Sequence, residues 1–170
     1  MTESIQIQLR PLGVADVDAV LQIQTQCYGA GFVEPRDVFA RRLQVAGQCS
    51  WAAVQGDEVL AYLAAYWSRP GAVTPLNGEF ADYADASVLY LHDMAVSPTA
   101  AGQGLARRMV DAAKATARQR GILRTALVSV QGSQAYWERQ GYSIEIVKNA
   151  AQQQHLATYG PQALYMVGLI

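Results

Sequence analysis

Residues 88–108, VLYLHDMAVSPTAAGQGLARR, carry the strongest structural signal in the sequence. The first nine residues are almost continuously apolar, as is typical of a strand that is covered on both faces. Small residues and two glycines follow Ser97-Pro98, and from Leu105 the apolar positions recur at helical spacing. The stretch therefore predicts a buried strand over 88–96, a glycine turn and a helix over 105–119.

The sequence on either side predicts the other elements of a mixed fold. Alternating or continuous apolar runs indicate strands, and apolar residues at helical spacing indicate helices. We expect further strands over 5–9, 50–55, 59–67, 122–130, 142–148 and 163–170, and further helices over 15–27, 35–46 and 133–140. Residues 68–87, rich in proline and glycine, form an irregular connection. The order β-α-α-β-β-β-α-β-α-β-β predicts one α/β (α+β) domain over residues 1–170.

Composition excludes several classes of function. The chain has 170 residues, a net charge of −1 and 51% hydrophobic residues. It has no overall basic field, which argues against nucleic acid or an anionic membrane as the main partner. The first residues lack a signal-peptide pattern, and no apolar run approaches the roughly 20 residues of a membrane span. Cys27 and Cys49 are isolated, so we expect no metal site and a cytoplasmic protein.

The glycine turn has the composition of an anion site. Gly102 and Gly104 let the backbone approach a ligand closely, and the first N–H groups of the following helix are free. A phosphate or pyrophosphate fits this chemistry. Arg107 and Arg108 lie in the first helical turn, where the helix dipole disfavours cations unless an anion is near. The alternatives are a tight connection and a solvated face in which Arg107 pairs with Asp111.

Two segments of the sequence resemble those of a known family. LHDMAVSPTAAGQGLARRMV (91–110) resembles the acetyl-coenzyme A binding motif of the GNAT superfamily of N-acetyltransferases, and SQAYWERQGY (133–142) resembles the helix and strand that follow it. The resemblance implies a mixed, mostly antiparallel central sheet with helices on both faces, splayed where its central strands accept the pantetheine arm. The family motif Q/R-x-x-G-x-G/A corresponds to 101–106, with Ala101 where the family usually has Arg or Gln.

The resemblance also implies which residues bind acetyl-coenzyme A. The backbone of Met94 to Val96 would pair with the pantetheine arm and orient the thioester carbonyl, and a backbone N–H there would stabilise the oxyanion. Backbone amides from Gly102 to Ala106 would bind the pyrophosphate. The full implied set is Met94, Ala95, Val96, Ala101, Gly102, Gln103, Gly104, Leu105, Ala106, Arg107, Gln134 and Trp137.

His92 is the candidate general base. It lies close to the expected thioester, and an ordinary imidazole titrates near neutral pH. In a regular strand Tyr90, His92 and Met94 project to one side, so Asp93 would face away from His92 and be structural. The alternative for His92 is a core histidine bonded to a backbone carbonyl. The other histidine, His155, is expected to be a solvated loop residue.

The general acid is less clearly marked. The family uses a tyrosine in the pattern FYExxGF, and Trp137 takes its place in this sequence. An indole N–H is not a usable acid near neutral pH. Trp137 would then pack against the coenzyme while Tyr136 or Tyr90 serves as the acid, or the thiolate would leave unprotonated. The acidic and aromatic stretch 78–87, GEFADYADAS, could attract a cationic amine.

These features predict an N-acetyltransferase that transfers the acetyl group of acetyl-coenzyme A to a primary amine of a small molecule, peptide or protein. Transfer should be direct, because neither cysteine lies in the predicted site. The protein would be a monomer or homodimer. The first alternative is an acyl-coenzyme A or coenzyme A binding module with little or no catalysis. The second is a small α/β domain whose turn binds no ligand.

Overall fold

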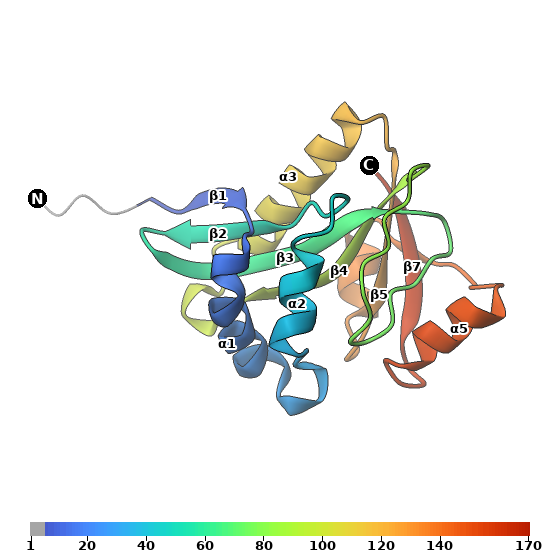
Figure 1. The fold of residues 1–170 in the computed structure, drawn as a ribbon, viewed down its shortest axis with the longest axis horizontal. Helices are drawn as coiled ribbons and strands as arrows, with labels where there is room; N and C mark the ends of the chain where they lie inside the picture. Colours follow the sequence, from blue (N-terminus) through green and yellow to red (C-terminus); the bar gives the residue numbers. More distant parts are fainter. Residues whose placement is uncertain (1–5) are drawn as a thin grey trace, which may run out of the picture.

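A seven-stranded sheet in the order β1-β2-β3-β4-β5-β7-β6 organises the computed structural model, which describes residues 6–170 (Figure 1). Its strands are β1 (Gln8–Pro11), β2 (Trp51–Gln55), β3 (Glu58–Ser68), β4 (Val88–Val96), β5 (Arg124–Ser129), β6 (Ser143–Ile144) and β7 (Leu164–Leu169). All neighbouring strands are antiparallel except β4 and β5, which are parallel. The predicted mixed, mostly antiparallel sheet is confirmed. The predicted start of the first strand, Ile5, lies outside the described residues.

Helices cover both faces of the sheet, as predicted. They are α1 (Val17–Tyr28), α2 (Arg36–Arg42), α3 (Leu105–Gln119), α4 (Gln134–Arg139) and α5 (Ala150–Ala157). Figure 1 shows α1 and α2 together on one side of the sheet and α3 on the other. β3 is buried on both faces because its side chains alternate between two cores: Tyr62 packs with Val20 of α1, and Leu63 packs with Met109 of α3.

Two predictions near the C-terminus are wrong. Only Ser143–Ile144 of the expected strand 142–148 pairs with β7 in the ladder. Helix α5 occupies a polar stretch that was expected to be a loop, because it has almost no apolar periodicity. Besides Leu156, which packs against the core under α1 and α2, its contacts are hydrogen bonds. His155 is not a solvated loop residue, since its Nδ1 lies 2.7 Å from the carbonyl oxygen of Val73.

A β-bulge in β4 overturns the expected alternation of His92 and Asp93. Ala64 of β3 pairs with Asp93, whereas the next residue, Ala65, pairs with Leu91. His92 is therefore an extra residue without a partner in β3, and a bulge of this kind breaks the period of two. The side chains of both His92 and Asp93 consequently turn toward the face that α1 and α2 cover.

β4 and β5 separate after a short paired segment. Val88–Leu91 of β4 pair with Arg124–Leu127 of β5, and the ladder ends there. β4 continues to Val96 with β3 as its partner on the other edge. From His92 onward, the edge of β4 that faces β5 is therefore free of strand pairing. This is the splay between the central strands that the family resemblance implies.

Candidate active site

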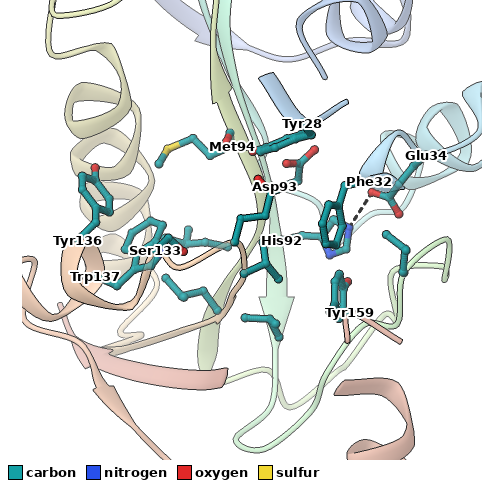
Figure 2. A pocket seen from close by; sticks show the side chains of 16 residues that line it. Tyr28, Phe32, Glu34, His92, Asp93, Met94, Ser133, Tyr136, Trp137 and Tyr159 are labelled. Atoms are coloured by element: carbon teal, nitrogen blue, oxygen red, sulfur yellow. Dashed lines mark hydrogen bonds and ion pairs between the residues drawn. The ribbon is translucent and has the colours of Figure 1, made fainter. Parts of the chain in front are cut away.

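The gap between the splayed strands opens into a cavity of about 310 Å³. Its lining comes from the ends of β4 and β5, the α1–α2 connection, α4 and two loops. The lining residues are Tyr28, Phe32, Glu34, Leu76, Leu91, His92, Asp93, Met94, Leu127, Val128, Val130, Gln131, Ser133, Tyr136, Trp137 and Tyr159. Figure 2 shows Ser133, Tyr136 and Trp137 on one side of Asp93 and Met94, with Phe32, Glu34 and Tyr159 on the other.

The backbone of β4 forms part of the cavity wall. The imidazole of His92 is only 1% exposed, although the residue as a whole is half-buried. The accessible part of His92 is therefore its main chain, at the point where β4 leaves β5. Two carbonyl oxygens of this segment already accept hydrogen bonds, that of Met94 from the hydroxyl of Tyr28 and that of Val96 from the thiol of Cys27 at 3.2 Å. The main-chain groups that have no such partner need one. The cavity wall can thus pair with an extended ligand that carries amide groups.

A buried network of charges fixes the side chain of His92. The guanidinium of Arg42 is fully buried and donates two hydrogen bonds to the carboxylate of Glu34, at 2.6 and 2.5 Å. It also donates to the carbonyl oxygen of Gly78 at 2.8 Å. The main-chain N–H of Asn77 donates to Glu34 at 2.9 Å, and Nε2 of His92 lies 3.0 Å from Oε1 of Glu34. The network joins the α1–α2 connection, α2, β4 and the loop 69–87.

The ionisation of Glu34 determines how the imidazole of His92 is protonated. Burial alone would raise the pKa of Glu34, but His92 and Arg42 outweigh it and hold that pKa well below its usual range. An ionised carboxylate only accepts hydrogen bonds, so Nε2 of His92 must be the donor. Nδ1 of His92 is buried and has no hydrogen-bond partner within the described residues. In the neutral ring this nitrogen is a free acceptor.

Asp93 is a second buried carboxylate, but it is held differently. Its Oδ2 accepts hydrogen bonds from Gln24 at 2.7 Å and from the hydroxyl of Tyr62 at 2.6 Å. Burial raises the pKa of Asp93, and these hydrogen bonds only partly oppose the effect. No salt bridge to Asp93 occurs in the part of the chain that the structure describes. Unlike Glu34, it therefore carries an uncompensated negative charge when ionised.

The glycine turn leads from β4 into α3 as expected. Gly102 and Gly104 have φ angles of +79° and +71°, a left-handed conformation that L side chains rarely adopt. An added Cβ at either position would meet no atom within 4 Å, so the space beside the turn is open. No side chain caps the start of α3. The exposed turn thus presents free N–H groups at a helix N-terminus, which suit a pyrophosphate.

The remaining predicted coenzyme residues differ in how much of each the structure exposes. Ala101, Gln103 and Arg107 are exposed at the turn, and Arg107 lies 3.7 Å from Asp111 in an exposed pair. Ala106 is half-buried at the turn, and Met94, Val96 and Trp137 are half-buried along the splay. Leu105 and Ala95 are buried, so only their main chains can contribute. Gln134 donates to Glu138 at 2.7 Å and does not line the cavity.

Of the two predicted candidates for the general acid, only one lines the cavity. Tyr136 lines the cavity beside Trp137, with ring centroids 5.0 Å apart. Tyr90 is fully buried between Tyr66 and His92 and does not line the cavity.

The acidic stretch 78–87 does not face the cavity either. Glu79 pairs with Arg41 at 2.7 Å and Asp85 with Arg69 at 2.6 Å, both on the surface. The loop contributes Leu76 to the lining instead. The carboxylates near the cavity are therefore Glu34 and Asp93.

Sequence reasoning missed Glu34 and Arg42, although one signal pointed to them. Arg42 lies on the same helical face as Val38 and Phe39, four and three residues earlier, and both of these are buried. A charged residue on the apolar face of a helix needs a buried partner. The partner, Glu34, is eight residues away across the start of α2, and only the tertiary structure identifies it.

Comparison with known proteins agrees with this geometry. Residues 17–142 match the model of the acetyltransferase (GNAT) family, so the chain belongs to that family. No curated protein matches the sequence. In the described residues, no helix is long and apolar enough to cross a membrane.

Solved structures share the fold at low sequence identity. The ribosomal-protein-S18-alanine N-acetyltransferase of Escherichia coli has 17% identity and a TM-score of 0.70, and the match covers 97% of this chain and 94% of that one. The PaiA N-acetyltransferase of Thermoplasma acidophilum, in complex with coenzyme A, has 10% identity, a TM-score of 0.68 and coverages of 97% and 99%. The GphF GNAT-like decarboxylase, in complex with isobutyryl-CoA, has 16% identity, a TM-score of 0.72 and coverages of 95% and 98%.

The buried network predicts a large effect of Glu34→Gln on stability. Removing the carboxylate leaves the guanidinium of Arg42 buried without a counter-charge, which typically costs about 3–5 kcal/mol. We expect a loss of that size in the free energy of unfolding, measured by urea denaturation. Glu79→Gln is the matched control, because it also removes an arginine partner but at a side chain 52% exposed. Similar losses in both variants would contradict the conclusion that Glu34 is the required counter-charge of the buried Arg42.

The same network predicts the sign of the pH dependence. Because the pKa of Glu34 is lowered on folding, its contribution to stability is fully present above its ordinary value of 4.5 and is lost as the pH falls through the folded value. Below pH 4.5 the stability difference between the wild type and Glu34→Gln should therefore shrink as the pH falls. A difference that grew below pH 4.5 would contradict it.

Proposed function

We propose that the protein transfers the acetyl group of acetyl-coenzyme A directly to a primary amine. The observation that carries this proposal is the free edge of β4 from His92 to Val96, which borders the cavity and leads to the open turn at 102–106. The edge has the spacing to pair with the amides of a pantetheine arm, and the turn has free N–H groups for a pyrophosphate. The coenzyme A and isobutyryl-CoA complexes of two similar structures support this choice of donor.

The thioester supplies an activated acyl carbon, and the protein must manage charge and protons around it. In the overall reaction a C–N bond forms and the C–S bond breaks. Two protons leave the nitrogen of the ammonium: one ends on the sulfur of coenzyme A and the other in solvent. Main-chain N–H groups beside Met94 are placed to stabilise the negative charge that develops on the carbonyl oxygen.

His92 is the proposed general base. Glu34 accepts its Nε2–H and so leaves the lone pair of Nδ1 free. A carboxylate that orients an imidazole in this way also stabilises the charged ring that forms when the base takes a proton. Since the imidazole is 1% exposed and Nδ1 is buried, this role requires the surrounding side chains to open a path to Nδ1, either for the amine or for one bridging water.

Tyr136 is the proposed donor of a proton to the departing sulfur. It lines the cavity on the side of α4, whereas Tyr90 has no access to the cavity and receives no role. Trp137 packs against Tyr142, with ring centroids 5.3 Å apart, and shapes the same wall. We treat residues 1–170 as a single catalytic domain, because β1 and β7 belong to one sheet.

Coenzyme binding is tested by calorimetric titration with acetyl-coenzyme A, coenzyme A and desulfo-coenzyme A. We expect saturable binding, weakened about tenfold or more in Gly104→Ala because the strained turn must move its N–H groups. Gly121→Ala is the matched control: its φ of +73° and its open surroundings are the same, but it lies at the opposite end of α3. Equal affinities in the two variants, or no saturation at millimolar ligand, would refute the site.

Catalysis is tested by the pH dependence of kcat, measured by thiol release. His92→Gln should lower kcat by about 10²–10⁴-fold and remove the acidic limb of the pH profile, which reports protonation of the base. The chain has two histidines, so His155→Gln is the control and should keep that limb. If kcat of His92→Gln kept the same pH dependence as the wild type, His92 would be excluded as the base. Tight binding with no turnover of any amine would favour a coenzyme-binding module instead.

A further inference from the structure

We propose that the acceptor is a primary amine with a single positive charge, attached to an apolar and preferably aromatic body that carries no carboxylate. This inference rests on the proposed function and specifies its substrate class. It follows from what the half of the cavity opposite Trp137 contains and from what it lacks.

The acceptor half has an aromatic and aliphatic wall. Tyr28, Phe32, Leu76 and Tyr159 line it, and they come from the end of α1, the α1–α2 connection, the loop 69–87 and the turn after α5 (Figure 2). Phe32 is half-buried and belongs to neither hydrophobic core cluster. Its ring is therefore available to a ligand.

The two tyrosines present their rings rather than their hydroxyls. The hydroxyl of Tyr28 donates to the carbonyl oxygen of Met94, and that of Tyr159 donates to the carbonyl oxygen of Thr74 at 2.7 Å. Both polar groups are thus used within the protein. A flat, apolar substituent can pack against such rings edge-on or offset.

The cavity wall has no cation for an acidic acceptor. None of the residues that line the cavity is a lysine or an arginine. A free amino acid would have to bring its carboxylate into this apolar half without a partner, which is costly. The wall therefore selects against amino acids and for amines that lack a carboxylate.

The available negative charge limits the acceptor to one ammonium. Glu34 is already neutralised by Arg42, whereas Asp93 has hydrogen-bond donors but no cation. One ammonium beside Asp93 would supply the missing counter-charge. The further ammonium groups of a polyamine or an aminoglycoside would face Phe32 and Leu76 with no second carboxylate free.

Hydrogen bonds from α5 and the turn after it hold this wall in place. Gln152 accepts from the N–H of Val73 at 2.7 Å, and Thr158 accepts from the N–H of Leu76 at 2.9 Å. Together with the bonds that His155 and Tyr159 make to 73–74, they fix both backbone ends of the segment 73–76. A wall fixed in this way discriminates by shape, because it cannot adapt cheaply to a polar or branched acceptor.

The test compares kcat/KM for 2-phenylethylamine, L-phenylalanine and spermidine on the full-length protein at saturating acetyl-coenzyme A, measured by thiol release. L-Phenylalanine adds only a carboxylate to 2-phenylethylamine, and spermidine adds charge without the ring. We expect 2-phenylethylamine to be preferred over both by at least about 100-fold. Equal or higher values for either of the others would overturn the inference while leaving the proposed function intact.

Two variants localise the effect. Phe32→Ala should lower kcat/KM for 2-phenylethylamine by about tenfold or more and leave ethylamine nearly unchanged, because only the first has a ring to pack there. Asp93→Asn should raise KM for 2-phenylethylamine, and its thermal unfolding shows whether it folds. Ile146→Ala, at a residue that lies beyond the end of β6 and is 79% exposed, should change neither constant.

Each outcome separates this inference from the function on which it rests. If Phe32→Ala reduces both amines equally, or if Asp93→Asn folds and leaves KM unchanged, the acceptor does not lie against this wall and the inference fails. If acetyl-coenzyme A binds but no amine releases thiol, the acetyltransferase proposal fails and this one fails with it.

Discussion

The fully buried guanidinium of Arg42 imposes the constraint on which the acceptor side of the structure depends. A charge without solvent needs a counter-charge and a hydrogen bond for each donor. Glu34 provides the counter-charge, and the carbonyl oxygen of Gly78 provides a further acceptor. These partners come from the α1–α2 connection and the loop 69–87, so Arg42 ties two irregular segments to α2, and Glu34 joins them to β4 through His92. The orientation of His92 is a consequence, because its Nε2–H meets the same carboxylate.

The donor side of the site is local in sequence, and for that reason it was predictable. The limits of β4 and α3 agree with the expectations from 88–96 and 105–119, because a buried strand, two glycines and an amphipathic helix each leave a sequence pattern. The bulge at His92 leaves no pattern in the sequence. It depends on how β3 pairs with β4, and a shift of one residue turned Asp93 toward α1. Helix α5 escaped detection because hydrogen bonds to the loop 69–87 hold it, not an apolar stripe.

The shared fold alone does not identify the reaction. A GNAT-like decarboxylase in complex with isobutyryl-CoA matches this chain with a TM-score of 0.72, and an N-acetyltransferase matches it with 0.70. Chemistry must then follow from residues that the fold does not fix. In this chain the cavity residues Phe32, Glu34, Leu76 and Tyr159 come from the connections between the helices and strands, not from the sheet.

The two buried carboxylates link stability to function with opposite signs. The lowered pKa of Glu34 means that its ionised form stabilises the fold. The pKa of Asp93 is raised by burial, so the folded state binds a proton that the unfolded state has released, and this contribution to stability falls as the pH rises through the folded value. When Asp93 is ionised, the free protein bears the cost of a buried charge without a cationic partner. A bound ammonium would relieve that cost, so Asp93 would contribute to the affinity of the site for a cationic acceptor.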